Sequence, residues 1–91
     1  MIEDVAKILK VDTFKNTASG DSVTYILDSD NTFGSVYTTL ESNDAFQETD
    51  NNYMLNADVA NFAYVYNNAY VVELKGNFDS DTYSVTITEK Q

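Results

Sequence analysis

Carboxylates are the residues through which this chain could do chemistry. Its 91 residues include 15 Asp and Glu, 5 Lys and no His or Cys. A pair of carboxylates can hydrolyse a glycosidic bond, but that reaction needs a substrate cleft, which so short a chain has little material to build. The absence of His and Cys removes the commonest general base, the commonest metal ligands and a thiolate nucleophile. We therefore expect a protein that is not an enzyme and carries no cofactor.

One acidic turn has the spacing that begins a calcium-binding loop, with Asp28, Asp30 and Thr32 at alternate positions. An EF-hand also needs a glycine in the middle of its loop and a glutamate at its end. Phe33 and Thr39 stand at those two positions. A second acidic turn later in the chain lacks both residues as well. We interpret both as solvated turns and expect no metal site.

Charge is distributed unevenly along the chain. Between Lys15 and Lys75, residues 16–74 contain nine acidic residues and no basic one, whereas the two flanking parts contain six acidic and five basic residues. The net charge of −10 argues against direct contact with nucleic acid, because such a surface must neutralise phosphates. Mixed charges would keep the protein equally soluble, and an uncompensated acidic surface repels itself. We therefore expect the acidic stretch to bind a basic surface of another protein.

Nucleic-acid-binding proteins have basic surfaces of this kind. A domain of this length has a face about 30 Å across. Along that distance duplex DNA presents roughly 18 phosphates, about half of which face one way, a number comparable with nine carboxylates. Tyrosine is enriched at binding hot spots, although it is also a strong strand former that lines cores. The predicted partner-binding residues are Asp21, Asp28, Asp30, Glu41, Asp44, Glu48, Asp50, Asp58, Tyr64 and Tyr66.

In composition the chain resembles phage-encoded DNA-mimic inhibitors, including some anti-CRISPR and anti-restriction proteins. That resemblance implies an inhibitor that blocks the DNA- or RNA-binding channel of a host defence nuclease. The alternative is a virion or tail assembly subunit that associates with itself through strand edges, and a homodimer is compatible with either. No signal-like stretch or membrane-length apolar run is present. We therefore expect a cytoplasmic protein of a bacterial host cell that has no membrane contact.

An N-terminal helix and a set of strands must position these residues. Ile2, Val5, Ala6 and Leu9 form one apolar stripe and predict a helix over residues 2–10.

Residues 22–27 alternate and predict a strand, which a polar turn at 28–31 joins to a second strand at 33–40, a segment rich in Val, Tyr and Thr. Residues 82–88 alternate cleanly and predict a strand with one wet face.

Residues 41–61 leave alternatives open. A helical turn at 45–47 is one expectation, and a helical face over 55–66 competes with a hairpin of 62–66 and 69–74. We favour the hairpin, because its connecting asparagines, Asn67 and Asn68, tolerate the positive φ that a tight turn needs.

Residues 1–91 then form a single α+β domain, an N-terminal helix packed on an antiparallel sheet of about five strands in hairpins.

Overall fold

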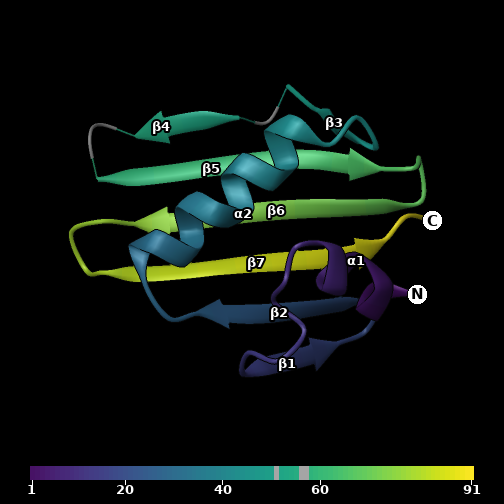
Figure 1. The fold of residues 1–91 in the computed structure, drawn as a ribbon, viewed down its shortest axis with the longest axis horizontal. Coiled ribbons are helices and arrows are strands. Elements are labelled where there is room, and N and C mark those ends of the chain that lie inside the picture. The colour runs from purple at the N-terminus through teal and green to yellow at the C-terminus, as the bar shows by residue number, and fades with distance from the viewer. Residues whose placement is uncertain (51, 56–57) are drawn as a thin grey trace.

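The computed structural model describes residues 1–50, 52–55 and 58–91. In chain order its elements are α1 (Ile2–Ile8), β1 (Asn16–Ser19), β2 (Ser22–Leu27), α2 (Asp30–Ser42), β3 (Phe46–Glu48), β4 (Tyr53–Leu55), β5 (Val59–Tyr66), β6 (Tyr70–Asn77) and β7 (Thr82–Glu89). All strands pair antiparallel in the order β1-β2-β7-β6-β5-β3, and β4 also pairs with β5 (Figure 1). The predicted α+β fold is confirmed, with six strands along this path and β4 beside it where about five were expected.

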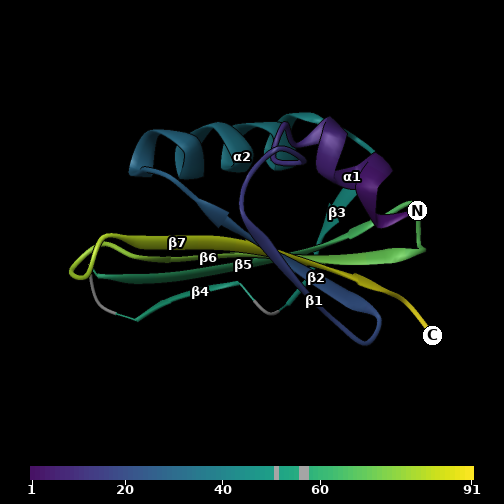
Figure 2. The same cartoon turned by 90° about the horizontal axis from the view of Figure 1, so that it is seen from below.

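The sheet has one covered face and one open face. Both helices lie on the same side of the sheet (Figure 2). Tyr83, Val85 and Ile87 of β7 point toward the helices and are buried, whereas Ser84 and Thr86 between them are half-buried on the other side. This alternation confirms the predicted strand and follows from the pleat, which points successive side chains to opposite faces. We call the side that no described helix covers the open face.

The N-terminal helix is confirmed, although α1 ends at Ile8 rather than at residue 10. Its apolar stripe packs toward the sheet, with Val5 and Ala6 fully buried and Leu9 nearly so. Lys10 then adopts a φ of 61°, which ends the helix and turns the chain toward β1.

Residues 30–42 form α2, so the predicted strand over 33–40 is wrong. Phe33, Val36 and Leu40 recur at helical spacing, and all three side chains are buried against the sheet. Their burial outweighs the strand propensity of the Val, Tyr and Thr residues in this segment, because tertiary packing overrides a weak local preference.

Polar side chains of α2 bond to its own backbone. Ser29 begins the helix by accepting a hydrogen bond from the Thr32 amide at 3.3 Å. The Thr38 hydroxyl donates to the Gly34 carbonyl at 2.9 Å, and the Thr39 hydroxyl donates to the Ser35 carbonyl at 3.1 Å. The hydroxyls of strand-forming threonines are therefore satisfied within the helix. In the part of the chain that the structure describes, no helix is long and apolar enough to cross a membrane.

The hairpin of β5 and β6 confirms the interpretation favoured for residues 62–74. Asn67 and Asn68 have φ values of 49° and 57°, the left-handed conformation that a two-residue type I′ turn requires at both positions. The competing helix over 55–66 is wrong for residues 59–66, because β5 pairs along its whole length with β6, and residues 56 and 57 lie outside the described residues.

The predicted helical turn at 45–47 is also wrong. Residues 46–48 form β3, which pairs with the C-terminal half of β5. Phe46 is buried there, and its ring centroid lies 4.7 Å from that of Tyr66.

Candidate protein-binding surface

Five aspartates extend from the end of the sheet at which α2 begins. The register sets Leu27 of β2 opposite Tyr83 of β7, and Val59 of β5 opposite Asn77 of β6, so the connections beyond them leave the same end of the sheet (Figure 1). The Phe78 amide donates to the Asp58 carbonyl at 2.6 Å and ties two of these connections together. We call the set the aspartate-rich end; its members are Asp28, Asp30, Asp58, Asp79 and Asp81.

Two of these carboxylates act on one buried tyrosine. Burial raises the pKa of Tyr83 to about 12, and a hydrogen bond with Asp81 together with the charges of Asp81 and Asp30 adds to the increase. Asp28 is held differently, because hydrogen bonds from the hydroxyls of Thr32 and Ser29 lower its pKa. Asp28 therefore stays ionised and has a fixed orientation beside the start of α2.

A second acidic group lies at the C-terminal end of α2. The hydroxyl of Tyr64 donates a hydrogen bond to the Glu41 carboxylate. The Glu41 carboxylate, through a hydrogen bond and through its charge, raises the pKa of Glu48 on the neighbouring strand β3. Asp44 lies in the turn between α2 and β3, and Asp50 follows β3. We call Glu41, Asp44, Glu48 and Asp50 the Glu41–Glu48 patch.

Uncharged helix surface separates the aspartate-rich end from the Glu41–Glu48 patch. A 13-residue helix such as α2 is about 20 Å long. Between its acidic ends, its exposed residues include Asn31, Ser35 and Thr38, and none of them is charged. Tyr37, 36 % exposed, packs on Phe62 at a ring-centroid distance of 4.9 Å. The helix layer is therefore a polar ridge with an acidic group at each end.

Three of the predicted contact residues lie elsewhere. Asp21 is in the turn between β1 and β2, at the far edge of the sheet from β3, and accepts a hydrogen bond from the Gln91 side chain. Tyr64, predicted to contact a partner, is 1 % exposed and packs in the core instead. Tyr66 is half-buried between the rings of Phe46 and Tyr70. Tyr64 and Tyr66 therefore pack within the protein rather than beside the acidic residues with which the sequence analysis grouped them.

Asp79 and Asp81 were missing from the predicted surface. They belong to a flank of the chain that is nearly neutral when its charges are counted along the sequence. Only the pairing of β6 with β7 and of β7 with β2 brings their turn beside Asp28 and Asp30. The acidic turn was visible in the sequence, but its neighbours in space were not.

Few positive charges offset these carboxylates. Every Asp and Glu except the half-buried Glu73 is exposed. Within the described ranges, the ion pair that the structure records joins the N-terminal ammonium group to Asp4 at 3.1 Å. The acidic residues at both ends of α2 therefore expose their side chains to solvent, an arrangement that favours a cationic partner.

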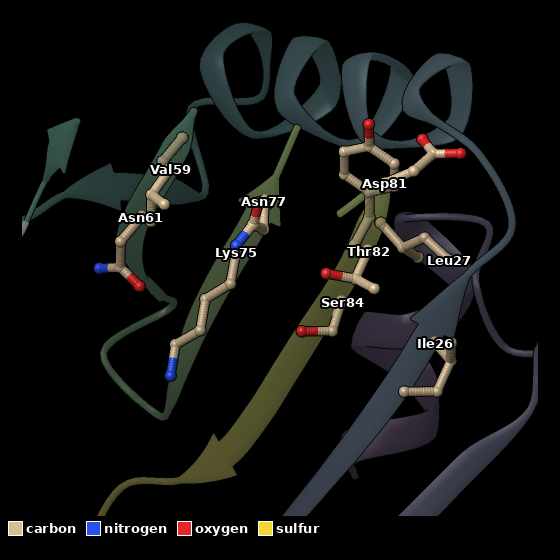
Figure 3. Close-up of a pocket in the computed structure, with 12 residues that line it drawn as sticks. Ile26, Leu27, Val59, Asn61, Lys75, Asn77, Asp81, Thr82 and Ser84 are labelled. Atoms are coloured by element: carbon tan, nitrogen blue, oxygen red, sulfur yellow. The ribbon is translucent and has the colours of Figure 1, made fainter. Parts of the chain in front are cut away.

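A shallow groove of about 510 Å³ lies on the open face near the aspartate-rich end (Figure 3). Lys75, Asn61 and Ser84 line it, and Ile26 and Val59 stand at its two sides. Among the described residues, no group of three or more carboxylates lies close enough to hold a metal ion. Lys75 and Asp81 are the charged residues among those that line the groove, and its other polar side chains are neutral.

We compared the chain with protein-family models, with curated proteins and with solved structures, and none of them matches it. Its class is therefore defined by its own structure. Over the described residues it is an α+β protein with two helices on one side of an antiparallel sheet, and every carboxylate except that of Glu73 belongs to an exposed residue.

Proposed function

We propose that this protein binds the basic nucleic-acid-binding surface of another protein and thereby excludes the nucleic acid. The observation that carries the proposal is the pair of exposed acidic groups at the two ends of α2. About 20 Å of duplex DNA carries roughly a dozen phosphates, of which about half face one way. The aspartate-rich end and the Glu41–Glu48 patch together have nine carboxylates across a similar span. Carboxylates bind the guanidinium group of arginine in a bidentate fashion, as phosphates do.

The placement of charge on α2 supports this proposal, because folding alone does not favour it. Asp30 in the first turn suits the helix dipole, but α2 has no basic residue in its last turn, and Glu41 lies there. A negative charge at a helix C-terminus is unfavourable, as is the repulsion between Glu41 and Glu48. Both costs are relieved when a cationic surface binds beside them.

The test is capture of partners from a bacterial host lysate on the immobilised protein, followed by competition. We expect a nucleic-acid-binding protein to be retained, to elute as the salt concentration rises, and to be displaced by duplex DNA or RNA. Salt and nucleic acid should each release the partner, because salt screens its cationic surface and nucleic acid competes for it. Retention that nucleic acid cannot displace would contradict the proposal.

Two triple variants separate local from total charge. Asp30→Asn, Asp44→Asn and Asp50→Asn remove three carboxylates beside α2, and we expect association with the captured partner to slow at least about tenfold. The matched control removes three carboxylates away from α2, through Glu3→Gln, Asp12→Asn and Glu89→Gln. Equal binding by the two variants would mean that net charge, and not the α2 surface, attracts the partner.

The finer proposal is that the partner is a host defence nuclease, so that the protein is an inhibitor of the anti-CRISPR or anti-restriction type. The identity of the captured protein tests it, together with inhibition of that nuclease. Recovery of only the chain itself would favour an assembly subunit that associates through strand edges.

A further inference from the structure

The open face differs from the rest of the surface in its charge. Because paired residues on neighbouring strands share a side, Thr24 of β2, Thr86 of β7 and Glu73 of β6 lie in one row across it. In the next row, Ile26, Ser84 and Lys75 lie together. Along β1, β2, β5, β6 and β7, the charged residues that point to this face are Glu73 and Lys75. The charges of these strand residues thus sum to zero, although the whole chain has a net charge of −10, and Asp81 adds one negative charge where the groove reaches the end of the face.

The hydroxyl groups of the open face bond to one another across β2 and β7. The Oγ of Ser22 lies 2.7 Å from Oγ1 of Thr88, and Oγ1 of Thr24 lies 2.9 Å from Oγ1 of Thr86. Hydroxyls that already have a partner lose less when water is removed from them. Ile26 adds a large apolar side chain that is 48 % exposed. Covering this face would therefore bury apolar area and leave few polar groups unsatisfied.

The two charged strand residues of the open face are complementary to the same residues of a second copy. Glu73 and Lys75 are two residues apart on β6, point to the same side and have opposite signs. In a symmetric dimer the same surface contacts itself, so a residue that meets a second residue on the partner is met by it in return. A two-fold axis that passes between these residues sets each Lys75 opposite the Glu73 of the other copy. Two ion pairs then form in place of two repulsions.

From the charge, hydrogen bonding and symmetry of this face, we propose that the protein forms a homodimer by packing the open faces of two copies against each other. A second copy is the occupant that fits, because Glu73 and Lys75 of one copy complement Lys75 and Glu73 of the other.

The size of the face predicts how tightly the dimer binds. Thr49 and Asn52 bond to the backbone of Ala63 at the edge of β5, so we leave β5 out of the dimer surface. The four neighbouring strands β1, β2, β7 and β6 remain open, and together they span roughly 20 by 25 Å. This area is at the lower limit of specific interfaces, and we expect a dissociation constant of about 1–100 µM.

The test is the molar mass by sedimentation equilibrium from low micromolar to about 500 µM, near physiological salt. We expect twice the monomer mass at the upper concentrations. Lys75→Glu makes the face acidic, and we expect it to weaken the dimer at least about tenfold. The matched variant, Glu73→Lys with Lys75→Glu, exchanges the two charges and keeps them complementary. We expect it to dimerise within about threefold of the parent.

Any one of several results would overturn the proposal. They are a monomer at the highest concentration, a dimer that Lys75→Glu leaves unchanged, and a charge-exchanged variant as weak as the single one. Larger assemblies that persist in high salt would also overturn it and point to pairing at strand edges. Thermal melting checks that each variant is folded. The triple variant at Asp30, Asp44 and Asp50 leaves Glu73 and Lys75 unchanged, so binding to a basic partner and dimerisation can fail independently.

Discussion

Glu48 is a position where folding and surface charge oppose each other. The neighbouring Glu41 raises the pKa of Glu48 in the folded protein. Stability from this interaction is therefore present in acid and is lost as the pH rises through the folded-state pKa. Removing the repulsion with Glu48→Gln should raise Tm at neutral pH by about 1–3 °C. The gain should be smaller near pH 4, where Glu48 is largely protonated, and melting curves followed by circular dichroism at both pH values measure it.

Glu89→Gln is the matched control for this prediction. It also removes one exposed carboxylate from the end of a strand, but Glu89 is not involved in the pKa shift of Glu48. If both variants raise Tm equally, the total charge and not the Glu41 contact explains the gain. If the gain of Glu48→Gln is larger in acid, the direction of the interaction is wrong.

Individual side chains of β5 show why the tyrosines could not be assigned from the sequence. Apolar residues occupy both faces of this strand, since Phe62 and Tyr64 face the helices while Ala63 and Val65 face the other side. Ala63 is buried as well, at 2 % exposure, although it faces away from the helices. Without a polar face to mark the outside, the sequence does not tell which tyrosines belong to the core.

Among the elements, α2 shows where two sequence patterns conflict. Its residues alternate well enough to resemble a strand, yet Phe33, Val36 and Leu40 also recur at helical spacing. The helical signal that could have decided the question is Ser29 as a capping residue before an acidic first turn. The hairpin of β5 and β6 was predictable because two consecutive asparagines suit only a tight turn.

Capping by Ser29 gives a direct test of how α2 begins. Its Oγ accepts a hydrogen bond from the Thr32 amide, which has no other partner within the first turn of the helix. We expect Ser29→Ala to lower the free energy of unfolding by about 1 kcal/mol, and Ser29→Asn to restore most of it. Urea unfolding followed by circular dichroism measures both variants.

The control for the capping prediction is Ser35→Ala on the exposed side of the same helix. Alanine has the higher helix propensity, so this change should leave stability equal or slightly increased. A loss of stability as large as that of Ser29→Ala would show that serine side chains stabilise α2 in some way other than capping. Failure of Ser29→Asn to recover stability would contradict capping directly.

At the scale of the whole molecule, the position of the acidic residues on the surface follows from strand order and not from their order along the chain. Counting along the sequence predicted an acidic stretch from residue 16 to residue 74 and two neutral flanks. The fold instead brings Asp79 and Asp81 from one flank to the aspartate-rich end, and it leaves Asp21 at the far edge of the sheet. The amount of charge was evident from composition, but its position depends on strand order, which only long-range pairing sets.

Because the chain has ten excess negative charges, the stability of its fold should increase with salt concentration. Compaction brings the carboxylates together, and salt screens that repulsion. We expect Tm to rise by about 3–6 °C between roughly 0.02 and 0.3 M sodium chloride, and by less in the triple variant at Asp30, Asp44 and Asp50. A fall in Tm would mean that attractive ion pairs stabilise the fold. Binding to a cationic partner should weaken over the same range, so salt should stabilise the protein while it dissociates the complex.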